Sequence, residues 1–102
     1  MNRVLFLAIG TGLVLASFGA RAQDTEDLEA RRLFEAGEIA FRGGNYDRAL
    51  ERFRQAYELS QRPELLYNIA STAERLRRDE RALVNYRSYL EALPNAENRR
   101  AV

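Results

Sequence analysis

The chain has 102 residues, enough for one small domain. Its 16 basic residues, all Arg, nearly balance 15 acidic residues, so it lacks the excess positive charge with which nucleic-acid-binding proteins displace counterions from phosphates. It has no His and no Cys, which removes the commonest general base, the usual metal ligands and every disulfide. We therefore expect no catalytic residues, no metal, no cofactor and no nucleic-acid partner.

Residues 1–22 have the features of a secretory signal peptide. Arg3 is followed by an uncharged, largely apolar stretch at 4–18, and Ala20-Arg21-Ala22 has the small-x-small pattern of a cleavage site. The apolar stretch is shorter than the ~20 residues of a comfortable membrane span, although an uncleaved N-terminal anchor is the alternative. We expect cleavage between Ala22 and Gln23, export to the periplasm or cell envelope, and no membrane span afterwards.

Residues 23–94 are predicted to form four helices. Asp24 or Thr25 is expected to cap the first helix, and Gly43-Gly44 to end it in a left-handed conformation. Asn45 and Asp79 are expected to cap the second and fourth helices, and Pro63 fits the first turn of the third. Pro94 should close the fourth helix, and 95–102 has the composition of the start of a capping helix.

Each predicted helix has one apolar face at i, i+3, i+4, i+7 spacing. The faces consist of Leu33, Ala36, Gly37, Ala40 and Phe41, then Tyr46, Ala49, Leu50, Phe53, Ala56 and Tyr57, then Leu66, Ile69, Ala70, Ala73 and Leu76, then Ala82, Leu83, Tyr86, Tyr89, Leu90 and Leu93. No stretch alternates with a period of two, so strands are not indicated. The sequence predicts an all-α fold.

Residues 30–62 and 63–95 repeat one template. Superposing the two segments places Leu33 on Leu66, Ala40 on Ala73, and Ala49 on Ala82, so that residues of similar size meet; Gly37 meets Ala70 and Phe53 meets Tyr86 in the same way. Self-similarity at a fixed period of about 33 residues is typical of helical solenoids.

These repeats resemble the tetratricopeptide repeat (TPR) family, in particular exported TPR proteins of Gram-negative bacteria. The similarity lies in the turn Gly44-Asn45-Tyr46, in the small and aromatic residues Ala49, Phe53 and Ala56, and in the segment 64–70 with Pro94 after it. The second unit departs from the family pattern at Arg77-Arg78-Asp79, where Gly-Asp-Tyr is usual. The resemblance implies two antiparallel helix-turn-helix repeats that form a short right-handed solenoid after the signal peptide.

The resemblance also implies a groove. In TPR proteins five spaced positions of each first helix point toward the concave face, and here they include Arg31 and Glu64. Asn68 stands where many peptide-binding repeats hold an Asn that bonds the ligand backbone. Phe34 and Glu38 replace the Lys and Asn of repeats that clamp a peptide C-terminus. The peptide-groove residues predicted in this way are Phe34, Glu38, Phe41, Arg42, Tyr67, Asn68, Ser71, Glu74 and Arg75.

Two functions remain open from the sequence. The first is a non-catalytic scaffold that binds another protein, or a peptide segment of it, in this groove. The second is a self-associating structural repeat, that is, a homo-oligomer. For Phe34, Phe41 and Tyr67 the alternative to a groove is burial against a missing neighbour or against the segment next to the signal peptide, and Arg54 is expected on the outer face of the second helix.

Overall fold

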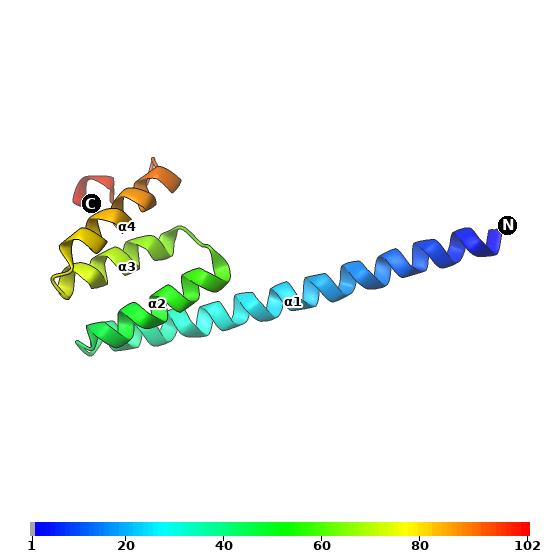
Figure 1. Cartoon of the computed structure of the whole chain (residues 1–102), viewed down its shortest axis with the longest axis horizontal. Coiled ribbons are helices and arrows are strands. Elements are labelled where there is room, and N and C mark those ends of the chain that lie inside the picture. The colour runs from blue at the N-terminus through cyan, green and yellow to red at the C-terminus, as the bar shows by residue number, and fades with distance from the viewer. Residues whose placement is uncertain (1) are drawn as a thin grey trace.

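The computed structural model describes the backbone of residues 2–102 and the side chains of residues 22–102. Its elements are α1 (Asn2–Arg42), α2 (Tyr46–Ser60), α3 (Glu64–Arg75), α4 (Asp79–Ala92) and a short 3-10 helix, η1 (Arg99–Ala101) (Figure 1). No strand occurs within the described backbone, which confirms the all-α prediction. Most of the predicted signal peptide, 1–22, lies outside the residues whose side chains are described.

The helices pack as two hairpins placed side by side. α1 packs on α2, α3 packs on α4, and α2 joins the hairpins by packing on α3. The N-terminal half of α1 extends well beyond α2, which makes the molecule 68 Å long but only 29 and 21 Å in its other dimensions (Figure 1). Among the described residues no helix is both long and apolar enough to cross a membrane.

The connection between α1 and α2 forms as the sequence predicts. Gly44 has φ +79°, a left-handed conformation that glycine adopts without a steric penalty. The backbone N–H groups of Gly43 and Asn45 donate to the carbonyls of Ile39 and Ala40 at 3.1 and 2.8 Å, so the last carbonyls of α1 are satisfied. The Asn45 side chain accepts from the Arg48 N–H at the start of α2.

Three details of the helix ends and faces differ from the prediction. α1 runs without interruption through Asp24 and Thr25, so neither residue occupies an N-cap. Asp79 is the first residue of α4 and Arg78 occupies the cap, with no side-chain hydrogen bond there. Leu83, assigned to the apolar face of α4, is 50 % exposed because no further helix covers it in the described chain.

The core lies where α1, α2 and α3 meet. Phe53 is its largest fully buried hydrophobic side chain, and Leu50 and Ile69 pack beside it. Ala49 and Ala56 of α2 are completely buried, since side chains of this size let helices approach closely. The core thus combines residues from the predicted apolar faces of the first three helices with Leu65, which the prediction for the third helix did not include.

Beyond α4 the chain turns back along the same helix. The Tyr89 hydroxyl donates to Asn98 Oδ1 at 2.7 Å, and the Arg99 guanidinium donates to the Pro94 carbonyl at 2.7 Å. Residues 95–102 form turns and the three-residue η1 rather than an α-helical turn. Tyr89, which is buried, stands where the first repeat has Ala56.

Candidate functional site

A hollow of about 260 Å³ opens between α1 and α3, the first helices of the two hairpins. Every predicted groove residue except Glu74 and Arg75 lines it, with Phe53 and Thr72 contributing to its floor. The residues come from α1 and α3 because each helix turns one i, i+3, i+4, i+7 face to this side. The structure thus brings together most of the residues that the sequence assigned to one site.

A second hollow of about 470 Å³ adjoins the first, toward the start of α3 and the middle of α1. Phe34, Glu38 and Asn68 line both hollows, so the two form one continuous surface, which we call the α1–α3 groove. Its additional lining comes from Asp27, Ala30, Arg31, Glu35, Ser60, Arg62, Glu64 and Leu65. Acidic and basic side chains alternate along it, so its charge is mixed.

Sequence reasoning missed some of this lining. Asp27 lies one helical turn before Arg31, so extending the same helical face toward the N-terminus finds it. Ser60 and Arg62 come from the end of α2 and the connection to α3, where no periodic pattern applies. Their place in the groove depends on the path of that connection.

The groove aromatics are half-buried. The Phe34 ring lies 5.9 Å from the Phe53 ring, and the Phe41 ring packs edge-on against Tyr46 at 5.2 Å between centroids. Each ring is therefore held by the core on one side and still contributes to the wall of the groove.

Tyr67 is fixed by two further tyrosines. Its ring centroid lies 5.9 Å from that of Tyr86 and 5.5 Å from that of Tyr89, both on α4. Its edge still lines the hollow between α1 and α3. A rigidly held aromatic ring loses little conformational entropy when a ligand packs on it.

Asn68 offers an amide group to the groove. The Thr72 hydroxyl donates to the backbone carbonyl of Asn68 at 2.6 Å, but the Asn68 side chain itself makes no hydrogen bond with the residues described in the structure. It is half-buried beside Phe34 and Glu38 and lines both hollows. Its two donors and one acceptor are available to a ligand.

Glu74 and Arg75 contact their neighbours instead of lining the groove. The Tyr86 hydroxyl donates to Glu74 Oε2 at 2.8 Å. Burial, reinforced by this carboxylate, raises the pKa of Tyr86 to about 12. The Arg75 guanidinium lies 5.8 Å from the centre of the Phe41 ring and 6.0 Å from that of Tyr46, which joins α3 to the first hairpin.

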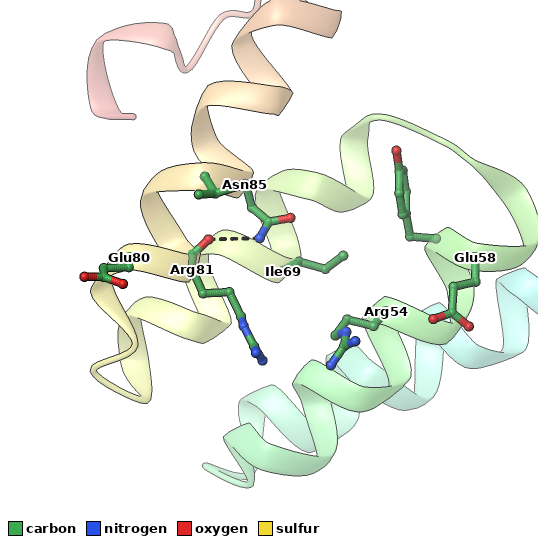
Figure 2. A pocket seen from close by; sticks show the side chains of 8 residues that line it. Arg54, Glu58, Ile69, Glu80, Arg81 and Asn85 are labelled. Carbon is green, nitrogen blue, oxygen red and sulfur yellow. Dashed lines mark hydrogen bonds between the residues drawn. The ribbon is translucent and has the colours of Figure 1, made fainter.

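A separate hollow of about 460 Å³ lies on another surface, between α2 and α4 (Figure 2). It is lined by Arg54, Tyr57 and Glu58 of α2, by Ile69 of α3 and by Glu80, Arg81, Val84 and Asn85 of α4. Arg54 therefore lies away from the groove, on the outer surface of α2 where the sequence placed it. We call this hollow the α2–α4 hollow.

The described residues offer little for metal chemistry. No group of three or more acidic side chains from this part of the chain is placed to hold a metal ion. His and Cys do not occur in the sequence. What the groove presents is aromatic surface, one amide and mixed charge, which suit noncovalent binding.

Comparison with known proteins gives a relative that covers most of the chain. No protein-family model matches it. Over 77 residues, 74% of the chain, it is 38% identical to a curated Drosophila melanogaster protein, Tetratricopeptide repeat protein 36 homolog. The chain spans only 42% of that protein's length. This similarity and the two packed hairpins of one repeated template agree, and together they indicate a similarity to the tetratricopeptide repeat family.

Proposed function

We propose that the chain is a non-catalytic protein-interaction scaffold that binds a peptide segment of another protein in the α1–α3 groove. The observation that carries the proposal is the position of the half-buried Asn68 amide, which has no partner among the described residues and lines the same hollow as the Phe34 and Tyr67 rings. An amide in such a place can donate to and accept from a peptide backbone, while the rings pack against side chains.

The shape of the groove favours a peptide over a small metabolite. Small-molecule sites enclose most of their ligand, whereas this groove consists of two joined open hollows that run along α1 and α3. Glu38 and Arg42 place opposite charges one turn apart along its wall. With mixed charge, binding should weaken only moderately as salt rises, unlike binding to a nucleic acid.

We infer that the partner is met in the periplasm or at the cell envelope. This part of the proposal is supported by the sequence of residues 1–22, with Arg3, an apolar stretch and the small residues Ala20 and Ala22. The resemblance to exported bacterial repeat proteins points the same way.

A double substitution in the groove tests the proposal. The protein serves as bait on a cell-envelope extract, and the captured partner is then titrated against Tyr67→Ala/Asn68→Ala. Because buried aromatic anchors dominate interfaces at about 2 kcal/mol or more each, we expect its affinity to fall at least about 30-fold. Circular dichroism verifies that the variant folds.

Tyr57→Ala/Asn85→Ala is the matched control. It removes the same two side-chain types from the α2–α4 hollow, so it should cause a similar loss of packing without touching the groove. The control should bind the partner as the parent does. Equal binding by the groove variant, or loss of binding by the control, would place the site elsewhere.

Self-association remains the second candidate function. Leu83 and Val84 on α4 are 50 and 61 % exposed, and exposed apolar side chains favour contact between molecules. Light scattering at increasing protein concentration tests for self-association: a mass that stays that of one chain argues against it, and a rising mass supports it.

A further inference from the structure

The α2–α4 hollow combines two unpaired arginines with an apolar floor. Figure 2 shows the Arg54 and Arg81 side chains extending toward each other across its opening, while the carboxylates of Glu58 and Glu80 lie at its outer ends. Within the described part of the chain, neither arginine side chain makes an ion pair; the one ion pair there joins Arg78 to Asp47. Two neighbouring guanidinium groups without an acceptor repel each other, and a carboxylate placed between them would remove that repulsion.

Val84 makes this hollow a site for an apolar side chain as well. It is 61 % exposed at the edge of the hollow, and the buried Ile69 lies beneath. A fitting ligand therefore carries one apolar side chain with carboxylates close to it.

The chain contains such a segment at 24–29. Asp24, Glu26, Asp27 and Glu29 supply four carboxylates, and Leu28 between them is 51 % exposed. All residues from 22 to 29 are exposed, because this part of α1 extends past α2 (Figure 1). Asp24 lies one helical turn before Leu28, on the same side of α1. The carboxylates and the Leu28 side chain of this segment thus complement the arginines and the apolar floor of the α2–α4 hollow.

The segment cannot reach the hollow of its own molecule. Residues 24–29 belong to the continuous helix α1, which is fixed against α2 by core residues such as Ala30 and Ala40. The α2–α4 hollow, by contrast, faces outward between α2 and α4. A rigid helix cannot fold back over this path, so the segment has to come from another molecule.

We propose that the acidic segment 24–29 of one molecule docks in the α2–α4 hollow of a second copy. Leu28 packs on Val84 over Ile69, and the neighbouring carboxylates lie against Arg54 and Arg81. The two surfaces differ, so the contact is heterologous and joins molecules head to tail. It leaves most of the α1–α3 groove uncovered and does not depend on peptide binding there.

Cross-linking tests the pairing, because the natural sequence has no cysteine. A Leu28→Cys protein is mixed with a Val84→Cys protein that carries a larger tag, and a short bis-maleimide is added. We expect a cross-linked heterodimer. Leu83→Cys is the matched control: Leu83 is adjacent in sequence and also exposed, but it does not line the hollow. It should give a several-fold lower yield.

Charge reversal then tests the ionic contact. Adding Arg54→Glu and Arg81→Glu to the Val84→Cys protein should abolish the cross-link, and adding Asp24→Arg and Asp27→Arg to the Leu28→Cys protein should restore it. Restoration also shows that the reversed proteins are folded. The proposal would be overturned by any of three results. These are no cross-link at all, equal cross-linking yields from positions 83 and 84, or a yield that does not change on charge reversal.

Discussion

Close contact between Gly37 and Phe53 fixes the spacing of the first hairpin. A Cβ atom at Gly37 would lie 2.6 Å from two carbon atoms of the Phe53 ring, closer than real Cβ contacts occur. Phe53 is only 2 % exposed and is surrounded by core residues, so its ring has little room to move. The absence of a side chain at position 37 is therefore a packing requirement.

Replacing Gly37 with alanine should destabilise the protein. The gain in helix propensity is at most about 1 kcal/mol, whereas overpacking a filled core costs about 1–3 kcal/mol. We expect a net loss of about 1 kcal/mol or more in the free energy of unfolding, measured by urea denaturation.

Gly43→Ala is the control for this substitution. A Cβ at Gly43 would meet only backbone oxygens, at 3.5 Å and beyond. Gly43→Ala should leave the free energy of unfolding unchanged or raise it by up to about 1 kcal/mol. If both alanine variants have the same free energy of unfolding, α1 and α2 do not approach each other closely at Gly37.

At the scale of the helices, the two hairpins turn at equivalent positions with different residues. Gly44 follows α1 with φ +79°, and Arg77 follows α3 with φ +61°. The Arg78 N–H donates to the Ala73 carbonyl at 2.9 Å, as the Asn45 N–H donates to that of Ala40. The second turn thus repeats the first although its residue has a side chain, which costs about 1–2 kcal/mol in this conformation.

Arg77→Gly should therefore stabilise the protein. Removing the left-handed strain outweighs the greater entropy of glycine in the unfolded chain, and we expect a gain of about 0.5–1 kcal/mol. The reciprocal change, Gly44→Arg, should lower stability by about 0.5–1 kcal/mol, because the lower entropy of arginine in the unfolded chain offsets part of the strain. Thermal melts test both variants: the melting temperature should rise for Arg77→Gly and fall for Gly44→Arg.

The predicted cleavage of a signal peptide would change the residue at which α1 begins. Cleavage between Ala22 and Gln23 would leave the acidic residues Asp24, Glu26 and Asp27 in the first turn, where negative charge stabilises a helix. The intact mass of protein from a periplasmic extract should equal that of residues 23–102. A full-length product that sediments with membranes would support the uncleaved anchor.

How far the sequence predicts the fold depends on how local each determinant is. The turn at Gly44, the cap at Asn45 and the apolar faces around Phe53 depend on neighbouring residues and periodicity, and they were predicted. The exposure of Leu83 was not, because the repeat pattern cannot tell that α4 lacks a covering helix in the described chain. Leu50, its counterpart in the first repeat, is buried where α2 packs on α3.

The groove shows the same distinction. Phe34, Glu38 and Asn68 could be predicted because one helical face and the family resemblance specify them. The contacts of Glu74 with Tyr86 and of Arg75 with Phe41 could not, because they depend on how the hairpins pack together. Side chains at the margin of the predicted face were drawn into contacts with neighbouring helices.

Across the whole molecule, the two hairpins create surfaces with different properties. The α1–α3 groove presents Phe34, Tyr67 and an Asn68 amide with no partner in the described chain. The α2–α4 hollow presents Arg54 and Arg81 above Ile69. Both surfaces depend on the packing of α2 against α3, which sets the distance between the hairpins. We expect the groove, with its aromatic walls, to bind the peptide.

Photo-cross-linking in cells tests the groove most directly. A photoreactive residue replaces Ser71, which lines the groove, and in a second protein replaces Asn85, which lines the α2–α4 hollow. Peptide binding in the groove predicts an adduct with another protein at position 71 that is lost with Asn68→Ala, and no adduct with that protein at position 85. An adduct with the partner at position 85 and none at position 71 would contradict it.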